Sequence, residues 1–201
     1  MGLRRTVSRG LGAVLVCLCL VGMPTRGMAH PHVFATNIAT FEFDAKGVKG
    51  IRLLWHFDEM FGSLLLEDYD ADGDGAFSPA EQKVLKSEAF DNLKNFGYFS
   101  HLSIGGQPHK VTDVQDFTAG VDGAEVFYSF VIPCRVAPGT DISLAVFDPE
   151  YYVDFYTPEG AAVRLENADA YSVTSKVAPN ADISFSTWLI TPTEISLRFS
   201  R

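Results

Sequence analysis

The segment formed by residues 70–81 constrains the fold more than any other part of the sequence. Oxygen-bearing residues alternate along it, and Gly75 stands where a tight turn would need a glycine. The spacing matches the twelve-residue calcium loop of an EF-hand, which takes its ligands from positions 1, 3, 5, 7, 9 and 12. Those positions are filled by Asp70, Asp72, Asp74, the carbonyl of Ala76, Ser78 and Glu81. The sequence therefore predicts a loop that holds Ca²⁺ as a structural ion.

Helical patterns lie on both sides of this loop. Residues 58–68 carry apolar side chains at helical spacing, and a second helix is expected to begin after Ser78. Ser78 can cap that helix, Pro79 suits its first turn, and Glu81 completes a capping box. These signals predict a helix-loop-helix insertion over residues 58–97.

The rest of the chain favours β-structure. Residues 33–43 and 48–57 alternate in hydrophobicity and predict a hairpin with a three-residue loop at 45–47. The expected register places Asp44 opposite Val48, and therefore Phe41 opposite Ile51. Shorter alternating runs follow from residue 102 to the end. We expect a mainly β, antiparallel, sandwich-like domain over residues 30–201, of the α+β class because of the inserted helices.

The first 29 residues have the order of a secretory signal. Arg4, Arg5 and Arg9 precede an apolar run over residues 11–23, and small residues follow at positions 27 and 29, three and one before the expected cleavage point. The run is shorter than the roughly 20 residues that span a bilayer. We therefore expect a periplasmic or secreted protein with no stable membrane anchor after cleavage. Cys134 would be its one remaining cysteine, so an internal disulfide is not expected.

Charge and motifs exclude several classes of function. The formal net charge is −9, and the four arginines of the leader account for part of the basic residues. Nucleic-acid binding needs clustered Lys and Arg, so no nucleic-acid partner is expected. The sequence lacks a nucleophile elbow, a zinc-protease His-Glu pair, a phosphate loop and a dinucleotide fingerprint. It therefore predicts a binding protein and not an enzyme.

Two histidines would stand at the mature amino terminus. Cleavage after residue 29 would give His30 a free α-amine beside its imidazole, with the imidazole of His32 close by. Pro31 has no amide hydrogen, which blocks the square-planar chelate that needs a deprotonated second amide. Further donors are required, and we select Asp58 and His101. Imidazole and carboxylate together suit Zn²⁺, Ni²⁺ or Co²⁺.

Four blocks of sequence carry a family resemblance. The blocks are HPHVF at the predicted mature terminus, residues 57–70, residues 92–101 and residues 147–155. In these the chain resembles an uncharacterised family of bacterial periplasmic proteins described as the periplasmic component of an ABC-type transport system. Members are often encoded beside, or fused to, nickel/cobalt-type membrane transporters. The resemblance implies transition-metal handling with a membrane metal transporter as partner, and it brings no defined activity.

The sequence thus predicts a periplasmic metal-binding accessory protein for divalent transition-metal transport, stabilised by calcium. Two alternatives stay open. One is a calcium-stabilised structural or interaction domain without a transition-metal role. The other is a copper enzyme in which the amino-terminal histidine and a second histidine brace the metal.

Overall fold

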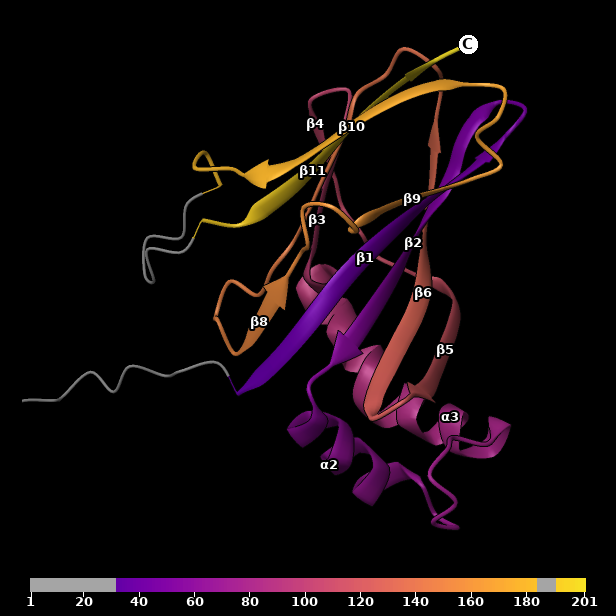
Figure 1. The fold of residues 1–201 in the computed structure, drawn as a ribbon, viewed down its shortest axis with the longest axis vertical. Coiled ribbons are helices and arrows are strands. Elements are labelled where there is room, and N and C mark those ends of the chain that lie inside the picture. The colour runs from indigo at the N-terminus through magenta and orange to yellow at the C-terminus, as the bar shows by residue number, and fades with distance from the viewer. Residues whose placement is uncertain (1–31, 184–190) are drawn as a thin grey trace, which may run out of the picture.

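The computed structural model describes residues 32–183 and 191–201 as a mainly β protein with two sheets and a helical segment (Figure 1). The predicted leader and His30 lie outside the described residues. The α+β class expected from the sequence is confirmed. The helices lie between the second and third strands, as the motif spacing predicted.

The larger sheet has six strands and is built around a long hairpin. Its order is β5-β6-β2-β1-β8, and β9 also pairs with β1. The strands are β1 (Val33–Asp44), β2 (Gly47–Phe57), β5 (Gln115–Asp122), β6 (Glu125–Val136), β8 (Val153–Tyr156) and β9 (Val163–Glu166). Strands β8 and β9 both run parallel to β1. The expectation of an antiparallel architecture was therefore wrong for this edge, where the sheet is mixed.

The hairpin register is the predicted one along most of its length. Phe41 faces Ile51, and the pairing continues to Ala35 opposite Phe57. A bulge after Glu42 shifts the register near the turn, so Asp44 pairs with Gly47 and not with Val48. The predicted three-residue loop is therefore a two-residue turn. Gly47 belongs to β2 with φ +125°, where an added Cβ would lie 2.1 Å from the carbonyl oxygen of Val136.

The smaller sheet has five strands in the order β10-β11-β7-β3-β4. These strands are β3 (Ser100–Ile104), β4 (Gln107–His109), β7 (Ile142–Val146), β10 (Ser172–Pro179) and β11 (Thr193–Ser200). All of its neighbours are antiparallel. Strand β11 comes last in the chain but lies inside the sheet, between β10 and β7.

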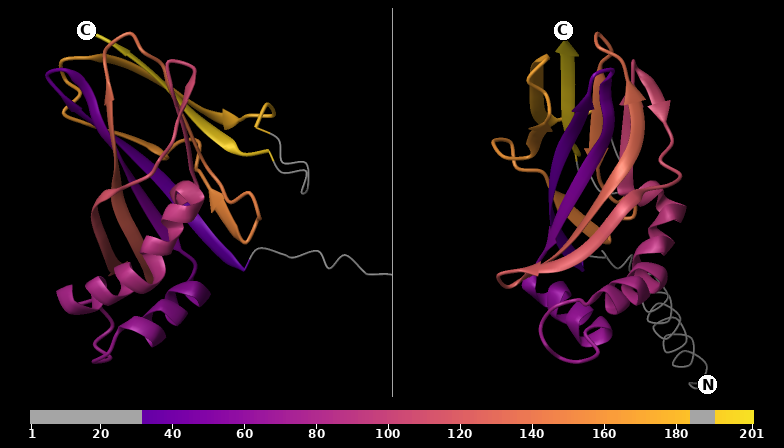
Figure 2. Two further views of the ribbon diagram at one scale, coloured as in Figure 1. Left: turned by 180° about the vertical axis from the view of Figure 1, so that it is seen from behind. Right: turned by 90° about the vertical axis from the view of Figure 1, so that its right-hand side faces the viewer.

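The two sheets share one hydrophobic core. Phe43 of the larger sheet packs edge-on against Phe199 of the smaller one, with ring centroids 5.1 Å apart. Both inner faces contribute fully buried side chains, among them Leu53 and Trp55 from the larger sheet and Ile142 from the smaller one. Figure 2 shows the sheets facing each other at one end and the helices covering the larger sheet at the other. The mainly β architecture expected from the alternating strands is thus present as two sheets that share a core.

The helical segment consists of α2 (Glu59–Tyr69), α3 (Pro79–Leu85), a π-helical turn η1 (Lys86–Phe90) and a 3₁₀ segment η2 (Asp91–Phe99). The predicted capping box of Ser78 and Glu81 is present at the start of α3. Phe90 attaches this segment to the sheet, because its ring is fully buried and lies 5.1 Å from that of Phe130. The helices are thus held against the part of the larger sheet that the smaller sheet leaves uncovered.

Candidate functional site

The acidic loop, residues 70–81, joins α2 to α3. Asp70, Asp72 and Asp74 each place a carboxylate oxygen within 4.8 Å of the other two. Asp70 follows the last residue of α2, so the end of that helix sets the position of the first carboxylate. The structure therefore brings together three of the six residues predicted to bind calcium.

Asp70 organises the loop backbone around its side chain. Its Oδ1 accepts hydrogen bonds from the backbone N–H groups of Gly73 and Asp74, at 2.9 and 3.2 Å. Its Oδ2 accepts from the N–H of Gly75 at 2.8 Å. Gly75 has φ +82°, a conformation that L side chains rarely adopt. The loop thus curls around Asp70, which satisfies its amides and holds the carboxylates close together.

Glu81 ties the end of the loop to its beginning. One carboxylate oxygen accepts from the backbone N–H of Ala71 and the other from that of Ser78, both at 2.8 Å. The hydroxyl and N–H of Ser78, followed by the N–H of Ala71, lower the pKa of Glu81. Glu81 therefore stays ionised and faces the loop, as a ligand at the twelfth position should.

Asp72 has the opposite electrostatic environment. The backbone N–H of Asp74 lowers its pKa, but the negative charges of Asp74 and Glu81, with desolvation, outweigh this and raise the pKa overall. Like charges held this close disfavour ionisation, and a cation between them would relieve the repulsion. The acidic loop therefore concentrates negative charge around Asp72.

The remaining predicted calcium ligands flank a buried anchor. Ala76 donates its N–H to Asp74 Oδ1 at 2.9 Å, and Ser78 caps α3 through its hydroxyl. Between them, Phe77 belongs to the hydrophobic core. The exposed acidic loop is thereby attached to the packed interior of the protein.

The predicted transition-metal ligands do not converge in the described part of the chain. The ring of His32 lies beside that of Tyr152, tilted by 45° and with centroids 5.0 Å apart. His101 lies exposed on the smaller sheet, with its ring stacked on Phe147 at a centroid distance of 3.6 Å. Partial desolvation lowers its pKa more than a hydrogen bond with the Phe147 backbone raises it. Across residues 32–183 and 191–201, the acidic loop is the one place where three or more His, Cys, Asp or Glu ligand atoms lie within 4.8 Å.

Asp58 has a structural explanation that the sequence analysis missed. Its Oδ1 accepts from the N–H groups of Met60 and Phe61, at 3.0 and 3.1 Å, and so caps α2. Its Oδ2 accepts from the N–H of Phe34 at 2.8 Å. Both oxygens are therefore engaged in joining β1 to the helix.

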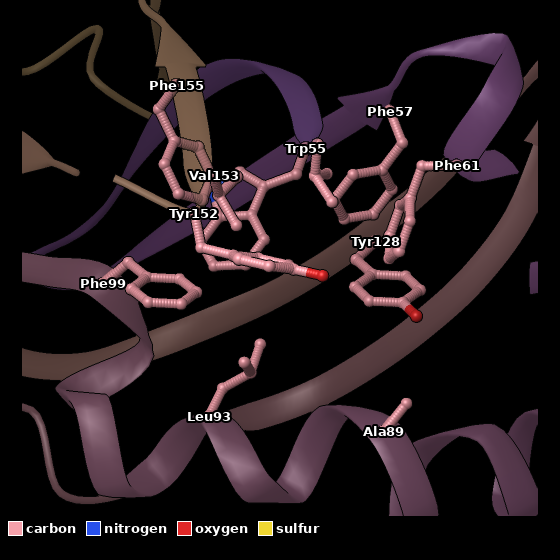
Figure 3. A pocket seen from close by; sticks show the side chains of 11 residues that line it. Trp55, Phe57, Phe61, Ala89, Leu93, Phe99, Tyr128, Tyr152, Val153 and Phe155 are labelled. Atoms are coloured by element: carbon pink, nitrogen blue, oxygen red, sulfur yellow. The ribbon is translucent and has the colours of Figure 1, made fainter. Parts of the chain in front are cut away.

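A second feature escaped the sequence analysis altogether. An aromatic pocket of about 200 Å³ lies between the larger sheet and the helical segment (Figure 3). It draws residues from positions 33 to 155, so no local motif announces it. Its apolar side chains look like ordinary core residues in the sequence.

None of the described helices is long and apolar enough to cross a membrane. Fold and loop together define the class: a two-sheet, β-rich protein with an acidic loop between two helices. The family described as "Protein of unknown function (DUF1007)" matches residues 15–189, so the chain belongs to this family. The prediction of an uncharacterised family is confirmed.

Two relatives show how far the similarity extends. The chain is 26% identical over 138 residues to "Uncharacterized 15.5 kDa protein in trpE 3'region" of Spirochaeta aurantia, covering 68% of this chain and 99% of that protein. It is 25% identical over 161 residues to an "Uncharacterized protein" of Haemophilus influenzae, covering 77% of this chain and 76% of that one. No solved structure matches the chain.

Proposed function

We propose that the protein is an exported, calcium-stabilised binding domain whose acidic loop holds one Ca²⁺ ion. The convergence of Asp70, Asp72 and Asp74 within 4.8 Å is the observation that supports this most directly. Calcium takes six to eight oxygen ligands, and carboxylates are the preferred kind. The Ala76 carbonyl, Ser78 and Glu81 lie in the same loop and would complete the set.

The ion's role is to join two helices. The loop begins at the end of α2 and ends in the first turn of α3, so an ion held by both ends restrains the angle between the helices. Phe77 connects the loop to the core, because its side chain is buried there. A single loop of this kind suits a structural role, and extracellular modules bind calcium with a Kd of about 10⁻⁴ to 10⁻³ M.

Export is proposed from the sequence of residues 1–29, which has the order of a secretory signal. Transition-metal transport stays a prediction from the sequence and the family resemblance. His30 lies outside the described residues, while His32, Asp58 and His101 each have another contact: an aromatic ring, a helix cap and a stacked phenylalanine. The geometry therefore favours the calcium-stabilised domain as the primary function.

Thermal unfolding of the full chain in chelator and in Ca²⁺ tests the proposal. If Kd is about 10⁻⁴ M, roughly 10 mM Ca²⁺ is a hundredfold excess and should raise the melting temperature by roughly 5–10 °C. Glu81→Gln should show a much smaller rise. Glu67→Gln is the matched control, because Glu67 lies exposed on α2 outside the loop.

Two results would contradict the proposal in different ways. If the wild type melts at the same temperature in chelator and in Ca²⁺, the loop is not a calcium site. Equal calcium-induced rises in Glu81→Gln and Glu67→Gln would leave a site in place but remove Glu81 from it.

A further inference from the structure

The aromatic pocket is open space in a part of the protein that is otherwise closely packed. One wall is the inner face of the larger sheet, where Trp55, Phe57 and Tyr128 are buried. The opposite wall is helical and presents Ala89 and Leu93. Figure 3 shows these helical side chains below the aromatic rings, with the hollow between them.

The hollow exists because a small side chain faces large ones. Ala89 contributes only a methyl group, while the next residue, Phe90, turns into the core and is fully buried. Well-packed interiors leave few voids larger than a water molecule. A volume of about 200 Å³ exceeds the roughly 150 Å³ of an engineered apolar cavity that stays dry and binds benzene.

The lining sets the polarity of what can enter. Aromatic and aliphatic side chains make up all of it, and no lining residue is an acid, a base or a histidine. The indole N–H of Trp55 is already donated to Asn37 Oδ1 at 3.1 Å. Tyr128 and Tyr152 carry the hydroxyls of the lining, and neither can neutralise a charge. A charged ligand would therefore lose its hydration without an oppositely charged partner, which costs several kcal/mol. The pocket therefore selects for uncharged molecules.

Tyr152 supplies both an entrance and a polar contact. Its side chain is 57% exposed although it lines the pocket, so it forms part of the rim. In Figure 3 its hydroxyl extends into the hollow. A ligand seated against the rings can therefore meet one hydrogen-bonding group at the rim, the arrangement typical of small-molecule sites.

We propose that this pocket binds a small, uncharged aromatic molecule with a single hydroxyl group, held by ring contacts and by the hydroxyl of Tyr152. The inference does not depend on calcium, because none of the acidic-loop carboxylates lines the pocket. It adds a ligand-binding activity to the proposed calcium-stabilised domain.

Titration of the full chain with phenol, toluene and benzoate, followed by NMR of side-chain methyl groups, tests the proposal. Phenol and toluene should shift the methyl signals of Ala89, Leu93 and Val153, whereas benzoate should not. Tyr152→Phe should weaken phenol binding by about two- to tenfold and leave toluene binding unchanged. Running each titration in Ca²⁺ and in chelator keeps this result separate from the calcium proposal.

Filling the pocket gives the sharper comparison. Ala89→Leu should weaken both phenol and toluene by about tenfold or more, whereas Ala124→Leu, in an exposed hairpin turn, should not. If Ala89→Leu does not fold, Leu93→Ala enlarges the pocket instead and should bind naphthalene more tightly than the wild type. The proposal is overturned if the shifts are absent or lie elsewhere, if benzoate binds as well as phenol, or if these pocket variants bind like the wild type.

Discussion

Replacing Asp58 should separate its structural role from the metal-binding role that the sequence suggested. The side chain accepts two hydrogen bonds as the cap of α2 and a third from the N–H of Phe34. Loss of an N-cap costs about 1 kcal/mol, and loss of the further bond costs about another 1 kcal/mol. Asp58→Ala should therefore lower the free energy of unfolding by about 2 kcal/mol.

Asp58→Asn divides this effect into its two parts. Asparagine caps helices about as well as aspartate, so the contact with α2 is kept. Its amide nitrogen would then face the N–H of Phe34, and two donors cannot bond. Asp58→Asn should therefore lose only about 1 kcal/mol, half the effect of the alanine variant.

Urea unfolding at constant Ca²⁺ measures both variants, with and without added Zn²⁺. A structural cap predicts the same loss of unfolding free energy with and without Zn²⁺. In thermal unfolding, the loss for Asp58→Ala corresponds to a melting temperature about 4–8 °C lower. Glu67→Gln, which changes one exposed acid on the same helix, should stay near the wild type. Losses that appear only with Zn²⁺, or an alanine variant as stable as the asparagine variant, would refute the capping argument.

Two further predictions follow from groups whose pKa is shifted. Burial raises the pKa of Cys134 to about 11, so a thiol reagent at pH 8 should modify it slowly in the folded protein and quickly in denaturant. The rate is measured on the labelled peptide that contains Cys134. Equal rates in the two conditions would contradict its burial. Partial desolvation beside Phe147 lowers the pKa of His101. As pH falls below about 6.5, the unfolded chain therefore gains a proton that the folded chain resists, and stability is lost. His101→Phe keeps the stacking on Phe147 but not the titration, so urea unfolding between pH 7.5 and 5.5 should show a smaller loss than in the wild type; parallel pH profiles would show that His101 does not contribute.

Local signals in the sequence predicted the features that short segments determine by themselves. The β1-β2 hairpin has the predicted pairing of Phe41 with Ile51, because alternation and a nearby turn fix the register together. The capping box at Ser78 and Glu81 is equally local. The acidic cluster followed from spacing alone, since three aspartates at alternate positions around one tight turn must come close together.

Long-range pairing left no comparable trace. Parallel contacts of β1 with β8 and β9, and the insertion of β11 between β10 and β7, depend on segments far apart in the chain. The predicted histidine site stays a prediction, because His30 lies outside the described residues and the other chosen donors come from distant segments of the chain. Asp58 and His101 were chosen by donor type, and a helix cap and a ring stack use them instead.

The parallel edge of β1 also has a consequence for the order of folding. Val33 pairs with Val153 and Ala39 with Val163. Strand β1 therefore cannot complete its pairing until the last third of the chain has been brought to it. Closing such long loops costs entropy before the contacts repay it, which slows the final step. The hairpin and β6 can form early, but until β8 and β9 arrive one side of β1 keeps unpaired amides and carbonyls. A chain that lacks residues 153–166 would therefore expose an unpaired edge strand that can pair with another chain. Aggregation would compete with folding until these residues are in place.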